Sequence, residues 1–385
     1  MTMSVLSAVW RPLKKEPMLP VSVAAAAVAL IITPPSARLL ADIDWRTLTT
    51  LFLMLTVLEG FKKENVLVPV LRLTARMRRP AALGMFLVFS VFFISMFVTN
   101  DVSLIIVVPI TILLFRAGGQ ERYILPLLAM ENIAAVRGSL LTPFGSPQNL
   151  FIFGQSGVSA WRFIGYMLPI WLLSGGLLAL FVWGLFRLRP APPMTVPPET
   201  FPERLPRERR FYRALYLTLF GVVIAMIVSR TAYWLYVAAA VTAAILLFDG
   251  RVLLRCDYVL ILTFFCFFVF SSSLAANPTI ADFLSRTIAG HEYVGSILVS
   301  QVISNVPAAI VLYPFAEHTG ALLYGLDSAG LVTLIGSLAS VINYRLYVRE
   351  YPGQGKAFIK FFTDISILFF LLVALPGYFI SRAPL

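Results

Sequence analysis

The chain has 385 residues, of which 59% are hydrophobic and only 13% are charged. A mean hydropathy of +0.86 excludes an ordinary soluble domain, and the alternating segments of a β-barrel are missing from the sequence. The formal net charge of +12 does not indicate nucleic acid as a partner, because the basic residues lie between apolar runs, where membrane topology accounts for them.

Apolar runs recur along the whole length, and this pattern predicts an all-α, polytopic helical membrane protein. Two of the runs are interrupted near the middle by polar residues, so they are not simple helices. The predicted spans are 18–34, 46–60, 81–115, 121–155, 160–186, 213–229, 231–249, 258–275, 293–315, 322–347 and 357–380.

The two interrupted runs break at similar short polar segments. Thr99-Asn100-Asp101 lies within 81–115, and Ser304-Asn305 lies within 293–315. Irregular backbone at membrane depth is tolerated only where it is buried in protein or lines a wet cavity. Each run is therefore either two successive helices or a re-entrant hairpin with these polar residues at its tip, and the distribution of charge favours the two hairpins.

A second pair of breaks follows the hairpins. The stretch from Thr142 to Asn149 cannot be a continuous helix, because Pro143 and Pro147 flank Gly145-Ser146. Its counterpart, from Thr333 to Ser337, holds Gly336 but no proline, and a Gly-Ser pair alone is often only a packing notch. The match between the two stretches favours a repeated broken helix and a binding site.

Charge predicts the topology. With both hairpins entering and leaving on one side, most arginines and lysines fall on the side of the N-terminus, which is then cytoplasmic. The first hairpin then opens inward and the second outward, as inverted repeats require. The expected domains are a first repeat with an N-terminal scaffold helix (1–187), a proline- and arginine-rich cytoplasmic linker (188–212) and an inverted second repeat (213–385). Two amphipathic stretches, 61–79 and 278–292, are expected along the interfaces.

Two charged residues inside the spans are candidates for chemistry. Asp101 could carry a proton, hold Na⁺ or only cap the half-helix that follows. Arg137 could bind an anion, or it could form a structural ion pair with Glu131 or Asp101. The sequence alone leaves these alternatives open.

The ordered set of motifs resembles the ion transporter superfamily, which includes arsenite efflux pumps, citrate-transporter-like proteins and divalent anion/sodium symporters. The segments 98–102, 139–149 and 300–307 are most similar to little-characterised bacterial inner-membrane members. The resemblance implies inverted repeats whose hairpin tips and broken helices bind substrate and coupling ion. An aspartate at the first tip is similar to arsenite-type members and implies proton coupling. The resemblance places one half of the site at Thr99, Asn100 and the 142–146 loop and the other at Ser304, Asn305 and 333–337. With the candidates from the residues themselves, the predicted substrate and ion site comprises Thr99, Asn100, Asp101, Arg137, Thr142, Gly145, Ser146, Asn149, Ser304, Asn305, Thr333, Gly336 and Ser337, and Asn100, Gly145, Asn305 and Gly336 are candidates for binding Na⁺.

Taken together, the sequence predicts a secondary transporter of a small anion or oxyanion-like solute in the bacterial inner membrane. It would work by alternating access, coupled to H⁺ or Na⁺, without a cofactor, and its relatives suggest a homodimer. One alternative is a Na⁺/H⁺ antiporter. A remote alternative is an integral-membrane enzyme acting on a lipid-linked substrate, which the scattered positions of the two histidines, His291 and His318, disfavour. No P-loop motif is present in the sequence, so ATP drive is not predicted.

Overall fold

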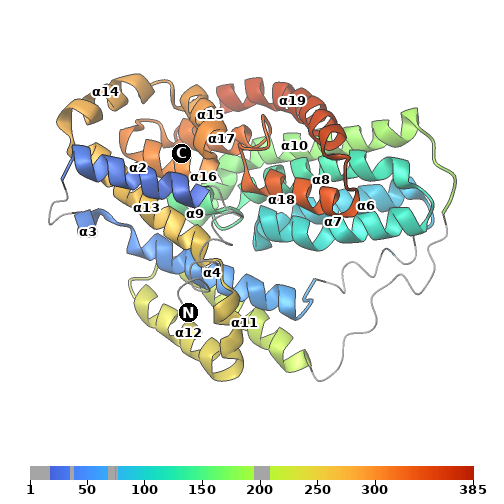
Figure 1. Ribbon diagram of the computed structural model, residues 1–385, viewed down its shortest axis with the longest axis horizontal. Coiled ribbons are helices and arrows are strands. Elements are labelled where there is room, and N and C mark those ends of the chain that lie inside the picture. Colours follow the sequence, from blue (N-terminus) through green and yellow to red (C-terminus); the bar gives the residue numbers. More distant parts are fainter. Residues whose placement is uncertain (1–17, 35–38, 68–73, 75–76, 195–208) are drawn as a thin grey trace.

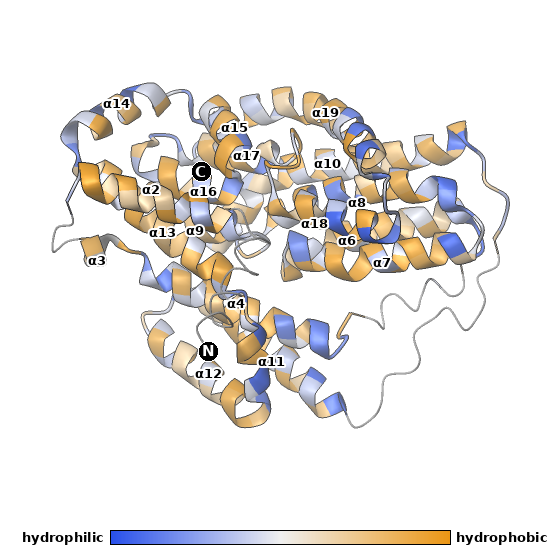
Figure 2. Cartoon of the chain, viewed as in Figure 1, coloured by the Kyte–Doolittle hydropathy of each residue, from blue (hydrophilic) through white to orange (hydrophobic). Residues whose placement is uncertain are grey.

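The computed structural model describes residues 18–34, 39–67, 74, 77–194 and 209–385, and every regular element in these ranges is helical (Figure 1). Within them, eight helices are long and apolar enough to cross a membrane. Apolar residues dominate these helices, and hydrophilic residues gather near their ends (Figure 2). The prediction of an all-α, polytopic membrane protein is confirmed. The eight are Pro80–Val98, Asn100–Ala117, Glu121–Leu141, Ala160–Leu188, Arg210–Ser229, Trp234–Arg255, Tyr258–Ala276 and Gly355–Ile380.

Both interrupted runs form helical hairpins that turn at the predicted residues. In the first hairpin, α6 (Pro80–Val98) packs against α7 (Asn100–Ala117). In the second, α15 (Glu292–Ile303) packs against α16 (Asn305–Leu312), which the short turn η7 (Tyr313–Phe315) extends. The hairpin tips therefore lie at Thr99 and Ser304.

Both predicted broken helices are interrupted. The first starts with the short turn η2 (Glu121–Tyr123). The second starts at Thr319, directly after His318 and earlier than the predicted residue 322. In each, a loop of non-helical backbone separates the two helical parts. The first comprises α8 (Ile124–Gly138), the short turn η3 (Ser139–Leu141) and α9 (Pro147–Ser156), and the second comprises α17 (Thr319–Ala329) and α18 (Leu338–Glu350).

The hairpins and broken helices form one packed body, which we call the central group. Two long helices, α10 (Ala160–Leu188) and α19 (Gly355–Ile380), complete it by packing against α8 and against each other. Helices α8 and α18 are in direct contact in the middle of this group. Segments from both halves of the chain therefore meet at its centre.

The remaining long helices form a second body, the scaffold group, on one side of the central group (Figure 1). Helix α2 packs along α13, and α4 packs against α11, α12 and α13. The contacts of α13 with α16 and of α4 with α9 join the two groups. The scaffold group comprises α2 (Met18–Ile32), α4 (Trp45–Lys63), α11 (Arg210–Ser229), α12 (Trp234–Asp249) and α13 (Tyr258–Ala276), with the short elements α3 (Leu39–Asp42), η6 (Gly250–Arg255) and α14 (Pro278–Ile288) beside it.

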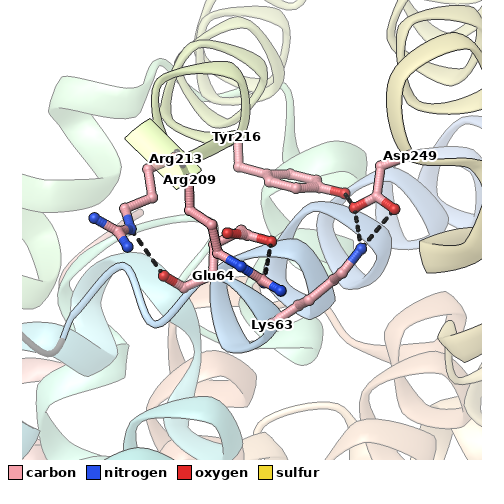
Figure 3. Close-up of polar contacts among 6 residues, drawn as sticks. All are labelled: Lys63, Glu64, Arg209, Arg213, Tyr216 and Asp249. Atoms are coloured by element: carbon pink, nitrogen blue, oxygen red, sulfur yellow. Dashed lines mark hydrogen bonds and ion pairs between the residues drawn. The ribbon is translucent and has the colours of Figure 1, made fainter. Parts of the chain in front are cut away.

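A partly buried polar cluster ties the scaffold helices together at the end of α4 (Figure 3). Lys63 donates to both carboxylate oxygens of Asp249 at 2.6 and 2.7 Å, and the hydroxyl of Tyr216 donates to Oδ2 of the same carboxylate at 2.8 Å. Arg209 pairs with the buried Glu64 at 3.0 Å. A buried carboxylate that lost such a partner would be strongly destabilising, so the cluster fixes α4 of the first half against α11 and α12 of the second.

The predicted linker begins where α10 ends and stops where α11 begins, and its residues 195–208 lie outside the described part of the chain. Of the two predicted interfacial stretches, 278–292 contains α14, while 68–73 and 75–76 of the other fall outside the description. The inverted orientation of the halves and the domain boundaries stay predictions.

Candidate functional site

The two hairpin tips adopt the same unusual backbone conformation. Thr99 has φ 70° and ψ 156°, and Ser304 has φ 69° and ψ 158°. Residues other than glycine rarely enter this region, which costs on the order of 1–3 kcal/mol and concentrates at functional sites. The paired sequence breaks thus correspond to paired backbone geometry.

A buried asparagine follows each tip and begins the second arm of the hairpin. Asn100 accepts a hydrogen bond at its Oδ1 from the N–H of Asp101 at 3.0 Å. The backbone N–H of Asn305 instead donates to the carbonyl of Gly336 at 3.3 Å, which joins the second tip to the second broken helix. Both arms start with the positive end of a helix dipole at the tip.

Each broken helix turns on a glycine that has no room for a side chain. A Cβ at Gly145 would lie 2.1 Å from the carbonyl oxygen of Ser139, and one at Gly336 would lie 2.3 Å from that of Ala329. Ser146 and Ser337 follow with extended backbone, at φ −148° in both cases, and each precedes the next helix. The predicted Gly-Ser pairs are therefore helix breaks and not packing notches.

Hydrogen bonds hold each hairpin on its own broken helix. Thr142 donates from its hydroxyl to the carbonyl of Met96 in the first hairpin. In the second half, Thr333 donates to Oε1 of Gln301 at 2.7 Å, and the amide of Gln301 donates to Ala329 at 3.2 Å. Sequence reasoning missed Gln301, because one glutamine in an apolar hairpin arm gives no distinctive signal.

One cavity of about 70 Å³ reaches residues of both hairpin tips. Asp101 from the first tip and Ser304 from the second line it, together with Arg345 of α18 and Asp257 at the start of α13. Of the predicted site residues, only Asp101 and Ser304 lie on its wall. Arg345 was not among the predicted site residues, and it reaches this cavity from α18.

Arg137 lies away from that cavity, and its side chain is only 1% exposed. Its Nε donates to the hydroxyl of Ser174 at 2.9 Å, and one terminal nitrogen donates to the carbonyl of Asp327 at 3.3 Å. The ion pairs considered with Glu131 and Asp101 do not form, since Glu131 accepts from Thr111 instead. Its hydrogen bonds in the central group are therefore made to neutral groups, while the carboxylate of Asp327 adds a favourable electrostatic interaction.

Asp327 is the functional candidate that the sequence analysis overlooked. Its side chain is 2% exposed, and its Oδ1 accepts from the amide of Gln148 at 3.0 Å, while Oδ2 is buried without a partner. Gln148 belongs to the first broken helix and Asp327 to the second, so the bond crosses between the halves. An acidic residue inside a predicted span was the available signal.

Several buried oxygen atoms near the broken helices lack a hydrogen-bond donor. They include Oγ of Ser146 and Oδ1 of Asn149, whose amide nitrogen donates to the carbonyl of Leu140 at 3.3 Å. Oδ1 of Asn132 and Oδ1 of Asn343 are likewise without partners where α8 and α18 meet. Such oxygens are suitable hard ligands for a small cation.

Comparison with known proteins places this geometry in a family context. The citrate transporter family matches residues 6–342. The inner membrane protein YbiR of Escherichia coli strain K12 is 33% identical over 346 residues, which is 88% of each chain. An uncharacterised transporter, MJ0456, of Methanocaldococcus jannaschii is 27% identical over 307 residues, covering 79% of this chain and 81% of its own.

Proposed function

This chain belongs to the citrate transporter family, and from that premise we propose that it moves a small anion or oxyanion-like solute across the inner membrane, coupled to H⁺ or Na⁺. It is a transporter and not an enzyme. The substrate class, the coupling ion and alternating access are the parts that we propose.

The observation that carries the proposal is the cavity reached by residues of both hairpin tips. Asp101 and Ser304 come from different halves of the chain, yet they line the same small space. Helices α7 and α16 begin at these tips, so two positive dipole ends are near it. Discontinuous helices with this arrangement are typical of transporter binding sites.

Charge in this cavity connects anion binding with a cation. The guanidinium of Arg345 is the group that would attract an anion, but the carboxylates of Asp101 and Asp257 oppose it. Asp257 caps α13 by accepting from the N–H of Leu260 at 3.0 Å. Binding of H⁺ or Na⁺ at Asp101 would remove one negative charge, so each ligand would raise the affinity for the other.

Arg137 would act at a distance in this scheme. It is a buried positive charge among the helices that carry the tips, and it contacts the main chain of Asp327 beside the second break. In a medium of low dielectric constant its potential at a given distance is larger than it would be in water. We therefore assign it a supporting role in anion affinity rather than direct contact.

A second candidate function, Na⁺/H⁺ antiport, draws support from the same cavity. Two carboxylates and one guanidinium line it, and unpartnered oxygens surround the breaks. Both features suit a cation at least as well as an anion. The two functions differ in whether any anion crosses the membrane.

Proteoliposomes separate these possibilities. The purified protein would be tested for uptake of labelled citrate, sulfate and arsenite, each under an imposed pH gradient or Na⁺ gradient. We expect uptake of one anion to be driven by one gradient, and Asp101→Asn to abolish that dependence. Asp257→Asn is the matched control, because it removes a carboxylate from the same wall and should leave gradient-driven uptake in place.

Three results would contradict parts of the proposal. Full gradient-driven uptake by the Asp101→Asn protein would remove Asp101 from the coupling step. Na⁺ movement against a pH gradient, with none of the anions transported, would establish the antiporter instead. An equal loss of gradient-driven uptake in the Asp101→Asn and Asp257→Asn proteins would mean that the carboxylates lining the cavity act only through their total charge.

A further inference from the structure

A second polar cavity lies away from the hairpin tips, where α4, α9 and the end of α11 meet. Its volume is about 100 Å³, and none of its lining residues belongs to a tip or to the two breaks. Two arginines from different elements line it, Arg46 at the start of α4 and Arg230 directly after α11. Threonine hydroxyls from α4, at Thr47 and Thr50, complete its polar wall.

Short contacts hold both arginines in place. Arg230 lies over the ring of Phe153, with its guanidinium carbon 4.2 Å from the ring centre, and it donates to the carbonyl of the same residue. Its Nε is buried and has no hydrogen-bond partner. Arg46 donates to the carbonyl of Thr231 at 3.2 Å. Two guanidinium groups are thus directed to one cavity while retaining donors that neutral contacts do not use.

The carboxylate that lines the cavity is occupied by other donors. Asp44 accepts at Oδ1 from the N–H of Thr47 at 2.9 Å, and at Oδ2 from the hydroxyl of Thr47 and from the amide of Gln155 at 2.6 Å. In the part of the chain that the structure describes, no acidic side chain forms an ion pair with Arg46 or Arg230. Burial and the positive charge of Arg46 lower the pKa of Arg230, as expected for like charges held close together.

We propose that Arg46 and Arg230 form a binding site for a small carboxylate or oxyanion, separate from the tip cavity. Guanidinium groups bind such anions through paired N–H donors, and a bound anion would remove the repulsion between the two cations. The hydroxyl of Thr50 lies on the same wall and supplies a neutral polar group beside them. This assignment does not depend on which solute the transporter carries.

The position of this cavity suggests a role. A larger cavity of about 420 Å³ shares Asp44 and Gln155 with it and extends along α13 to Tyr313 at the end of the second hairpin. The arginine site thus stands beside the space between the scaffold group and that hairpin. A net positive charge there would concentrate anions at the entrance to this space.

Charged thiol reagents provide the test in the detergent-solubilised full chain. Thr50→Cys places a reporter in the cavity, and Gly154→Cys provides a second reporter on an exposed part of its wall. The measured quantity is the rate ratio, the labelling rate of a negatively charged methanethiosulfonate divided by that of a positively charged one. We expect this rate ratio to be about tenfold higher with both arginines present than in the Arg46→Gln protein. Sulfate and citrate, used as probe anions, should slow labelling when both arginines are present.

The control is Arg162→Gln, which removes an exposed arginine that does not line this cavity and should leave the rate ratio unchanged. If Arg230→Gln fails to fold, Arg230→Lys takes its place. It keeps the charge and should retain part of the preference for the negatively charged reagent. The proposed site would be ruled out if Arg46→Gln leaves the rate ratio unchanged at both reporters. It would also be ruled out if neither anion slows labelling of the reporter proteins that keep both arginines. Labelling requires no transport activity, so this result is independent of the function proposed above.

Discussion

The two broken helices have matching backbones but different chemistry. Gly145 and Gly336 both press against a main-chain carbonyl, and the serines that follow them have the same extended backbone. Earlier in each helix, Gly138 and Gly325 sit against carbonyls of the adjacent hairpin arm. The geometry that builds a break is therefore repeated, and the difference between the halves lies in the side chains around it.

The two halves of the chain differ in the charged residues that they carry at corresponding positions. Arg137 stands directly before Gly138, whereas Tyr324 stands before Gly325, and both side chains bond to α10. At the tips, Asp101 follows Asn100, whereas the apolar Val306 follows Asn305. The backbone of tips and breaks is therefore repeated while charge is not, and the charged residues of the tip cavity come from both halves, Asp101 from the first and Asp257 and Arg345 from the second.

The largest expected effect tests the shared backbone. Gly145→Ala and Gly336→Ala each force a Cβ against a main-chain carbonyl, so each should lower the free energy of unfolding by on the order of 3 kcal/mol. Gly176→Ala is the control, since an added Cβ there meets no atom within 4 Å. Thermal unfolding in detergent measures all three. A loss confined to one of the two breaks would end the argument that they are equivalent.

The next effect concerns the bond that crosses between the halves. Asp327→Ala leaves the buried amide of Gln148 without its acceptor and should cost about 1–3 kcal/mol of stability. Asp327→Asn keeps an acceptor for that amide but, like Asp327→Ala, removes the negative charge that acts on the buried Arg137, so it should be more stable than Asp327→Ala by about 1 kcal/mol. Asp364→Asn, at an exposed site on α19, controls for loss of charge alone. Equal stability of the Ala and Asn variants would show that the crossing bond contributes nothing.

Arg137 and Tyr324 test the difference in charge. Arg137→Gln removes the buried cation and should weaken anion affinity about tenfold, equivalent to about 1.4 kcal/mol, whereas Tyr324→Phe removes only one hydrogen bond and should leave affinity nearly unchanged. Concentration-dependent uptake in proteoliposomes measures both. Arg137→Lys should recover part of the affinity. An unaltered affinity in the Arg137→Gln protein would limit this arginine to a structural role.

The fold was accessible from sequence because its signals are local. Apolar runs predict the helices, and a short polar segment or a proline-flanked glycine within such a run predicts a break. Thr99, Ser304 and Gly145 were identified for this reason and Gly336 by its match to Gly145, and the structure places an unusual backbone conformation or a tight turn at each.

The contacts of the site could not be derived in the same way, because they depend on tertiary packing. Asp327 meets Gln148 from the other half of the chain, and Arg345 reaches the tip cavity from α18. Likewise, no sequence spacing indicates that Arg137 would bond to Ser174 of α10. Which partner a buried charge takes is decided by the way helices pack.

The smallest expected effect concerns the strained tips. Thr99→Gly and Ser304→Gly relieve a conformation that costs on the order of 1–3 kcal/mol. Glycine also lowers the free energy of unfolding by about 0.4–1 kcal/mol, because it raises the conformational entropy of the unfolded chain. Each variant should therefore gain on the order of 1 kcal/mol of stability in thermal unfolding. Thr99→Ala and Ser304→Ala, which remove the hydroxyl without relieving the backbone, serve as controls and should gain nothing.

Transport measured on the same variants separates strain from chemistry. If the hydroxyls contact the solute, the Gly and Ala variants should lose anion affinity together, although only the Gly variants gain stability. Such a gain in stability with a loss of function is the usual relation at a strained functional site. Thr99→Gly could prove stabilising while Ser304→Gly proves destabilising. The backbone would then be strained at only one tip, where the surrounding structure maintains that strain. The two tips would share dihedral angles but not a role.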